Sequence, residues 1–372
     1  MSNKGFTRFV LLGLLALLPV LLLIGVYVVK DPFKVLTPYD GNAPAPTDTV
    51  QLTVNTGYVS VESFRFFEPE RHYDSFIFGS SLSGYYRIQD WIKHLPEGAS
   101  AFHMNASRET LLGILNKLNY LKKQGVTIKN ALIVMEDEML KRLPLDGDVL
   151  YVQHPLTARN VSWWTFHQLY FNAFRHPELF AYTLWPSTAT TGFVLEKGYA
   201  TTDIPDRIEA YNEGYYRWAD SLIATRPDAF YTPEHLARYT QPMRLMPCPD
   251  KVTPQVEELL KQIVAALTGQ GADYQIIIPP HYAWEAISSH DLYKLEQICG
   301  MERVHDYSHD AAMGTDLHYY YDDGHLISQQ CARLMDSAYH HTATLASPFF
   351  SHQTPKKVLK LRISQIKLRQ HR

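Results

Sequence analysis

Short apolar runs alternate along the chain with longer segments in which apolar residues recur every three or four positions. The run Ala-Leu-Ile-Val-Met at 131–135 is apolar throughout, which is typical of a strand buried on both faces of a parallel sheet. The pattern predicts five strands, at 74–78, 101–104, 131–135, 274–278 and 304–307. Because helical segments separate them, we expect an α/β fold in which helices cover both faces of a parallel sheet.

Capping residues mark the helical segments as clearly as the spacing does. Ser107 is expected to cap a helix that Gly125 closes, and its apolar positions are Leu111, Ile114, Leu115, Leu118 and Leu121. A second helix is predicted to begin at Thr253 and Pro254, a capping residue followed by a proline in the first turn. The last predicted helix covers 327–339.

Two stretches interrupt this alternation. Residues 140–250 contain aromatic runs such as Trp-Trp-Thr-Phe, and they predict a helical insertion packed over the sheet. Its aromatic side chains form either core or, less commonly, one wall of a substrate cleft. Residues 30–70 include a turn-rich, proline-containing segment and predict a semi-extended tether. The main domain is therefore expected at 71–345, followed by a basic tail at 346–372.

The N-terminus contains one segment that is long and apolar enough to cross a bilayer. Residues 9–29 carry no charge and end without a small-x-small cleavage site, which favours an uncleaved transmembrane anchor over a signal peptide. Lys4 and Arg8 precede this segment, so residues 1–8 are predicted to be cytoplasmic and the main domain periplasmic or extracellular. The basic tail either lies on an anionic bilayer or a partner protein, or is simply solvated.

Composition narrows the possible partners and cofactors. The net charge of −3 gives no bulk attraction to nucleic acid, so no nucleic-acid partner is expected. The three cysteines show no metal-ligand spacing and are interpreted as small buried side chains: Cys248, Cys299 and Cys331. Two histidines and two aspartates cluster without a recognised ligand motif: His305, Asp306, His309 and Asp310. We therefore expect neither a metal nor a cofactor.

Residues suited to acyl transfer stand near the two ends of the main domain. Gly79 follows the first strand and permits a tight turn, after which Ser81 could act as a nucleophile beside backbone amides that face a developing oxyanion. Asp322 and His325 precede the final helix. An imidazole can take the serine proton, and a carboxylate can fix its tautomer; Asp323 is an alternative orienter. Each motif also occurs in ordinary loops, so it is their order along the chain that indicates an active site.

Several polar residues fall at the carboxyl ends of the predicted strands. Ser81, Asn105 and Asp137 follow three different strands, and Pro280 follows a fourth. In open parallel sheets ligands bind at this edge. The sequence therefore predicts an active site there.

The Gly-Ser-Ser at 79–81 and the Asp-x-x-His at 322–325 resemble the SGNH hydrolase superfamily, in which an early Gly-Asp-Ser follows the first strand and a late Asp-x-x-His precedes the last helix. The anchor and the Gly-Ser-Ser variant are similar to its membrane-anchored branch, which includes the D-alanyl-lipoteichoic-acid protein D (DltD-like) and alginate acetylation proteins. The resemblance covers residues 70–345. It implies a three-layer, flavodoxin-like sheet and catalytic roles for Ser81, His325 and Asp322.

The two other blocks of that superfamily differ here. The second block offers a glycine amide, and Asn105 occupies about that place, either as an oxyanion donor or as a turn asparagine. The third block offers an asparagine, whereas this chain has Met-Glu-Asp-Glu at 135–138. Because a carboxylate would repel an oxyanion, Glu136 and Asp137 are expected to face the acceptor or to cap a helix.

The resemblance implies an extracytoplasmic enzyme that transfers an acyl group, most simply acetyl, to a cell-envelope or secreted polysaccharide or polyol through an acyl-serine at Ser81. It also implies a membrane-bound O-acyltransferase as partner, because a cytosolic thioester donor does not reach the outer side. Two alternatives remain open. One is a glycan O-acyl esterase that uses water as acceptor, and the other is a catalytically inactive SGNH-like scaffold for the acyltransferase.

Overall fold

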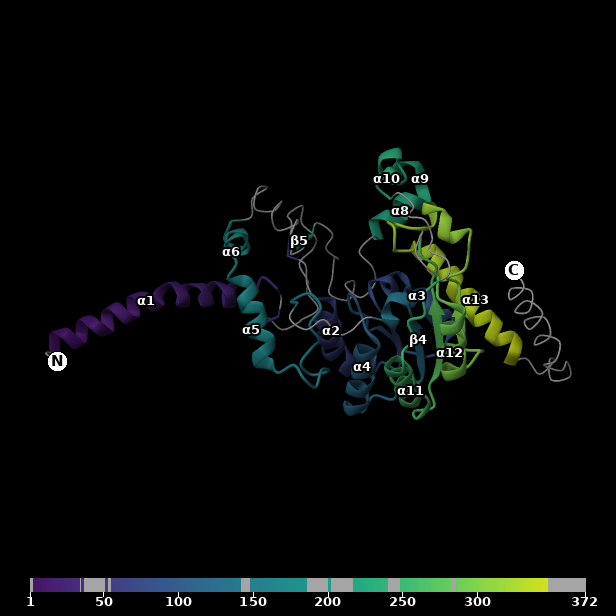
Figure 1. The fold of residues 1–372 in the computed structure, drawn as a ribbon, viewed down its shortest axis with the longest axis horizontal. Coiled ribbons are helices and arrows are strands. Elements are labelled where there is room, and N and C mark those ends of the chain that lie inside the picture. The colour runs from purple at the N-terminus through teal and green to yellow at the C-terminus, as the bar shows by residue number, and fades with distance from the viewer. Residues whose placement is uncertain are drawn as a thin grey trace.

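The computed structural model describes residues 3–33, 35–36, 51–52, 55–141, 148–185, 200–201, 217–239, 248–282 and 286–346. Residues 347–372 of the predicted basic tail lie outside the described residues, as do most of the predicted tether before residue 51 and parts of the predicted insertion. The described residues form an α/β body and one long N-terminal helix (Figure 1).

A five-stranded sheet forms the centre of the body, and all its neighbouring strands are parallel. Its order is β3-β2-β4-β6-β7, with bounds β2 (Ser75–Gly79), β3 (Ala101–His103), β4 (Asn130–Val134), β6 (Asp273–Ile278) and β7 (Val304–Asp306). All five strands predicted from the apolar runs are present, so the predicted α/β class with a parallel sheet is confirmed. The chain passes from β2 to β3 on one side and then to β4 on the other, so the carboxyl end of β2 is the switch point at which ligands bind in such sheets.

Both faces of the sheet are buried, which explains the unbroken apolar runs. Phe76 and Phe78 of β2 join one core cluster, whereas Ile77 joins a second on the opposite face. The first cluster is covered by α2 (Thr56–Arg71), α4 (Leu111–Lys123), α11 (Pro254–Thr268) and α12 (Ser289–Cys299). The second is covered by α3 (Ile88–Trp91) and α13 (Ser328–Ala346).

The predicted tether at 30–70 is too long, because its last part forms helix α2, which belongs to the body. Asn55 caps the helix by accepting a hydrogen bond from the Tyr58 backbone N–H at 3.0 Å. Its buried face mixes serines with apolar side chains, namely Ser60, Val61, Ser63 and Phe64. Those small polar residues interrupt the apolar periodicity, and the sequence pattern therefore does not reveal the helix.

Helix α4 begins one turn later than predicted. Its cap is Thr110, whose Oγ1 accepts the Gly113 N–H at 3.0 Å, whereas the expected cap, Ser107, donates its own N–H to Thr56 Oγ1 at 2.6 Å. The predicted cap of α11 is confirmed, because Thr253 Oγ1 accepts a backbone N–H in the first turn.

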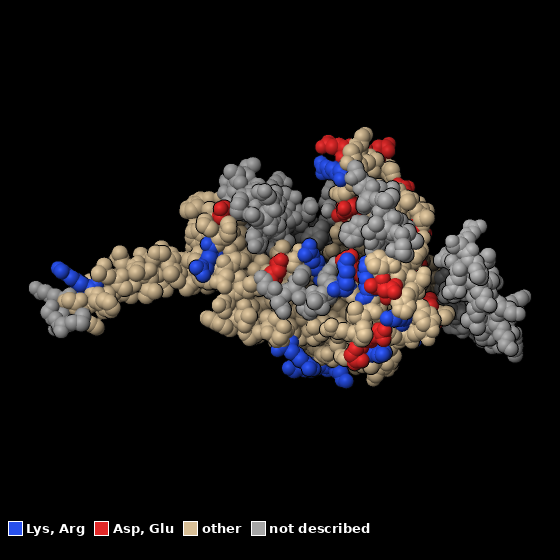
Figure 2. Space-filling model, viewed as in Figure 1, with Lys and Arg blue, Asp and Glu red and all other residues tan. Residues whose placement is uncertain are grey.

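The N-terminal helix α1 (Asn3–Lys30) contains one stretch, Gly5–Lys30, that is long and apolar enough to cross a membrane. Figure 2 shows it free of charged side chains between its two ends on the face in view. Its last turns pack against α5 (Trp163–Phe174) and α6 (Pro177–Leu184), in an aromatic cluster that also includes Tyr58 of α2. The anchor-like helix therefore joins the body directly.

The described part of the predicted insertion is largely helical, as expected. Beside α5 and α6 it contains α8 (Arg217–Thr225), α9 (Pro227–Phe230) and α10 (Pro233–Arg238), which lie on the opposite side of the body from α1 (Figure 1). A short strand, β5 (Ala200–Thr201), pairs antiparallel with β1 (Gln51–Leu52). The insertion thus contributes to both ends of the body.

Candidate active site

Strand β2 ends in a tight turn that places Ser81 at the carboxyl edge of the sheet. A Cβ at Gly79 would lie only 2.7 Å from Ser83 Cβ, so this turn requires glycine. Ser80 caps the short 3₁₀ helix η1 (Ser81–Tyr85) with its hydroxyl. Ser81 is the first residue of that helix, a position whose backbone N–H has no intrahelical acceptor and can bind a ligand oxygen.

Asp322 holds the imidazole of His325 in one orientation. The Nδ1 of His325 lies 2.8 Å from Asp322 Oδ2 and 3.0 Å from Oδ1, and the backbone N–H groups of Gly324 and His325 also donate to Oδ1. Burial alone would raise the pKa of Asp322, but these hydrogen bonds hold the pKa below its ordinary value. The carboxylate is therefore charged at neutral pH and favours a proton on Nδ1 of His325.

The other ring nitrogen of His325 faces Ser81. Its Nε2 lies 3.2 Å from Ser81 Oγ, although the two residues are 244 positions apart in sequence. The ring of Tyr85 packs edge-on against the imidazole with 5.3 Å between centroids, and the His325 side chain keeps 25% of its surface exposed. The structure thus brings Ser81, His325 and Asp322 together in the predicted order, at hydrogen-bonding distances and open to solvent.

A second serine–histidine pair lies behind the first. Ser83 Oγ donates to the Ser80 carbonyl at 2.7 Å and lies 3.0 Å from His103 Nε2. Because the hydroxyl proton is used for Ser80, the His103 ring must donate to Ser83. His103 is fully buried, and this burial lowers its pKa to about 3. The pair supports the turn from inside the protein.

Asn105 extends the ladder between β3 and β2 toward the same turn. The N–H of Met104 donates to the Ile77 carbonyl at 2.8 Å, and that of Ala106 donates to Gly79 at 3.2 Å. By strand alternation, Asn105 shares the face of His103. The side chain is buried, and within the described residues its Oδ1 has no hydrogen-bond partner. An acceptor left in this state beside the Ser81 turn is suited to a ligand N–H or O–H group, and the amide nitrogen of the same side chain is suited to a ligand oxygen.

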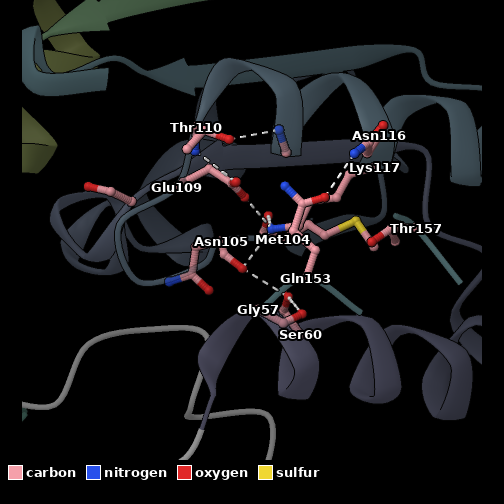
Figure 3. Close-up of polar contacts among 12 residues, drawn as sticks. Gly57, Ser60, Met104, Asn105, Glu109, Thr110, Asn116, Lys117, Gln153 and Thr157 are labelled. Carbon is pink, nitrogen blue, oxygen red and sulfur yellow. Dashed lines mark hydrogen bonds and ion pairs between the residues drawn. The ribbon is translucent and has the colours of Figure 1, made fainter. Parts of the chain in front are cut away.

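The backbone of Asn105 rests on a buried ion pair (Figure 3). Lys117 Nζ donates to the carbonyls of Met104 and Asn105 at 3.0 and 2.9 Å and to Glu109 Oε2 at 2.5 Å. Ser60 Oγ donates to the same Asn105 carbonyl at 2.9 Å. Figure 3 shows the Asn105 side chain pointing away from Lys117, so the pair fixes the backbone and leaves the side-chain amide outside this network.

The Met-Glu-Asp-Glu segment at 135–138 carries compensated charge. Asp137 and Lys251 form a buried ion pair, so the carboxylate is held by a cation. Burial, the dominant cause, lowers the pKa of His281 to about 4, although Glu136 opposes this shift. His325 lowers the pKa further, so His281 is a neutral imidazole at neutral pH.

Helix α8 of the insertion connects the two halves of the candidate triad. Its Asp220 accepts hydrogen bonds from Arg87, which follows η1, and from Tyr321 and Ser328, which flank the His325 loop. The Ser328 backbone N–H also donates to the Tyr321 hydroxyl at 3.0 Å. Asp220 therefore fixes the separation of the serine turn and the histidine loop.

Sequence reasoning missed several of these supporting residues. One signal was available for Lys117, which occurs on the apolar stripe of its helix between Ile114 and Leu121 at helical spacing. His281 follows the two prolines that come after β6, at the carboxyl edge of the sheet, which is a second usable signal. By contrast, nothing in the local sequence of Asp220 indicates its role, because all its partners are distant in sequence.

The residues considered for a metal make local contacts instead. His309 Nδ1 lies 2.9 Å from Asp306 Oδ2, and His305 Nε2 lies 2.8 Å from Gln275 Oε1. Within the described residues, no group of three or more histidine, cysteine, aspartate or glutamate side chains is arranged to hold a metal ion. No protein-family model matches the chain, and no curated protein is significantly similar to it in sequence.

Proposed function

We propose that this protein is a serine acyltransferase of the SGNH type that moves an acyl group, most simply acetyl, to a hydroxyl of a cell-envelope or secreted polysaccharide. One observation carries the proposal: Asp322, His325 and Ser81 form a continuous series of contacts at 2.8 and 3.2 Å. The series ends at a partly exposed hydroxyl on a strand-end turn, where an ester can approach it.

Ser81 Oγ attacks the carbonyl carbon of the donor ester, and its proton passes to Nε2 of His325. Collapse of the tetrahedral intermediate breaks the donor C–O bond, and the leaving alcohol takes that proton. The acceptor hydroxyl then attacks the acyl-serine, gives its proton to His325, and releases Ser81, which regains the proton. Asp322 keeps the imidazole in the required tautomer and stabilises its charged form in both steps.

Two donors are positioned for the oxyanion. The Ser81 backbone N–H is one, because its place at the start of η1 leaves it without an intrahelical acceptor. The side-chain amide of Asn105 is the other, because it is buried and its Oδ1 has no hydrogen-bond partner within the described residues. A half-turn of that amide exchanges Oδ1 and Nδ2, so it can present its N–H₂ group to the oxyanion.

The placement of the protein is part of the proposal. Helix α1 would cross the membrane once, with residues 1–8 in the cytoplasm and the α/β body in the periplasm or outside, as the basic residues before the span favour. A membrane-bound O-acyltransferase would then deliver the acyl group. The paired state of Asp137 supports an active enzyme rather than an inactive scaffold, because it removes a bare carboxylate near the oxyanion.

The test is acylation of the envelope glycan in cells that carry Ser81→Ala in place of the wild-type chain. Acyl transfer should fall by at least about 10⁴-fold, because loss of the nucleophile removes the covalent route. Unchanged acylation would reject the proposal. Incubating the purified full chain with acylated glycan separates transfer from hydrolysis, since net release of free acid without transfer would instead favour an esterase.

A further inference from the structure

Helices α5 and α6 form a surface whose composition is unusual for the exterior of a soluble domain. Helix α5 contains no Lys, Arg, Asp or Glu, and α6 contains only Glu178. Two tryptophans stay largely exposed there, Trp164 at 77% and Trp185 at 71%. Exposed tryptophan on uncharged helices is typical of the membrane–water interface, where one end of the ring is apolar and the other is hydrated.

This surface is continuous with the helix that is apolar enough to cross a membrane. The ring of Tyr27 on α1 packs edge-on against Phe171 of α5, with 5.6 Å between centroids, and in a tilted arrangement against Phe174, with 5.4 Å between centroids. Leu23 and Val26 of α1 pack on the same aromatic cluster. Leu23 lies about two turns before the end of α1, or ~10 Å along its axis. Helix α5 therefore reaches past the polar end of α1, to the level of its apolar segment.

The orientation of α5 agrees with this depth. Figure 1 shows α5 crossing the end of α1 steeply, so α5 runs along the plane of a bilayer that α1 would cross. Trp164 and Phe171 are seven positions apart and therefore share one face of α5. Because α5 runs along the bilayer plane and its Phe171 contacts α1, Trp164 lies at a similar depth in the bilayer, ~10 Å away along α5. Arg175 is exposed at the end of α5, where a lipid phosphate can bind it.

We propose that the α5–α6 surface lies in the headgroup and upper acyl region of the bilayer that α1 crosses, as an interfacial platform of the monotopic kind. The occupant is phospholipid, because the surface continues directly from a helix whose own neighbours would be lipid. The platform gives the body a second contact with the membrane and so fixes the tilt of the α/β domain. This proposal is independent of the acyl-transfer chemistry and depends only on α1 spanning the bilayer.

The test uses the full chain in phosphatidylcholine vesicles that contain a lipid with a nitroxide near the top of its acyl chain. Cys248 is first changed to serine, since it is the partly exposed cysteine, whereas Cys299 and Cys331 are buried. Trp164→Cys then carries an environment-sensitive fluorophore. The matched control is Tyr293→Cys on α12, which is 60% exposed and lies on an element far from α1 in Figure 1.

We expect the nitroxide lipid to reduce emission from position 164 by about two-fold or more, because an interfacial helix buries its apolar face ~5–10 Å into the boundary region. Aqueous iodide should quench the label at 164 poorly and the label at 293 well. Equal quenching of both labels by iodide, with none from the lipid, would overturn the proposal. Protection of position 164 from both quenchers would mean that a second copy covers the surface, and this too would overturn it.

Discussion

Two serine–histidine pairs lie within one turn of each other, and only one of them has the features of a catalytic pair. The distances hardly differ, at 3.2 Å between Ser81 Oγ and His325 Nε2 and 3.0 Å between Ser83 Oγ and His103 Nε2. Their surroundings differ in every other respect. His325 has a carboxylate behind it and an exposed edge, whereas His103 is buried and has no partner for Nδ1 within the described residues.

The comparison shows that contact distance does not identify a proton acceptor. Burial lowers the pKa of His103 to about 3, and the Ser83 proton is already used for the Ser80 carbonyl. Neither condition permits transfer from serine to histidine at neutral pH. At His325 the charged Asp322 would stabilise the imidazolium that forms in the proposed transfer. Solvent exposure and a carboxylate at the other ring nitrogen therefore distinguish a pair suited to catalysis from a structural one.

Removing each serine in turn tests directly which of the two pairs is catalytic. Ser81→Ala should reduce labelling by a fluorophosphonate probe by at least about 10⁴-fold, because the reacting oxygen is gone. Ser83→Ala is the matched control, and it should keep labelling within about ten-fold while losing ~1–3 kcal/mol of stability, since it leaves a buried donor unpaired. Labelling that survives Ser81→Ala and disappears in Ser83→Ala would reverse the assignment. The measurement is gel-based labelling of the full chain in detergent.

The next largest effect is expected from the carboxylate that distinguishes the two pairs. Asp322→Asn should lower the turnover of an activated ester, such as p-nitrophenyl acetate, by about 10³–10⁴-fold, because the amide cannot enforce the required tautomer. Asp323→Asn is the control, since its neighbour Asp322 provides both contacts to Nδ1, and turnover should change by less than about two-fold. Similar losses in both variants would remove Asp322 from its assigned role.

A smaller effect is expected at the amide beside the reactive pair. Asn105→Ala should lower the turnover number for the same ester by about 10²–10³-fold, with little change in KM, if this side chain binds the oxyanion only in the transition state. Asn160→Ala alters an exposed asparagine and should leave both constants unchanged. A rise in KM with unchanged turnover would instead assign Asn105 to ground-state binding.

The smallest effect concerns the structural pair and appears in acid. The pKa of His103 is depressed in the folded protein, so the unfolded chain alone binds this proton between about pH 6.5 and pH 3. The stability that neutral His103 contributes is therefore complete above pH 6.5 and falls with decreasing pH. Between pH 7 and pH 5 the loss should be ~2 kcal/mol.

His103→Gln removes this titration and provides the comparison. Urea unfolding in detergent should show that the variant loses ~2 kcal/mol less than the wild type between pH 7 and pH 5. His281, with a pKa near 4, contributes equally to both proteins and cancels in the difference. An identical acid loss in the two proteins would show that His103 is not held neutral by burial.

Much of the fold was predictable because its signals are local. The continuous apolar runs of β2, β4 and β6 follow from burial on both sheet faces, and the cap of α11 is encoded in two adjacent residues, Thr253 and Pro254. Helix α2 was missed because its buried serines interrupt the apolar period, and the cap of α4 was misplaced from Thr110 to Ser107. Local patterns predict an element well only when its buried face is uniformly apolar.

The candidate site also combines features that local sequence predicts with features that it does not. The sheet, the apolar N-terminal helix and the identities of Ser81, Asp322 and His325 could be predicted from the sequence, because each depends on a few neighbouring residues. Which serine meets which histidine, and which residues support them, depends on contacts that form only in the folded chain. Lys117 under Asn105, and Asp220 between the serine turn and the histidine loop, act through contacts 12 to 133 residues apart. The local pattern indicates that Lys117 is buried, but which residues pair at such separations depends on how the whole chain packs.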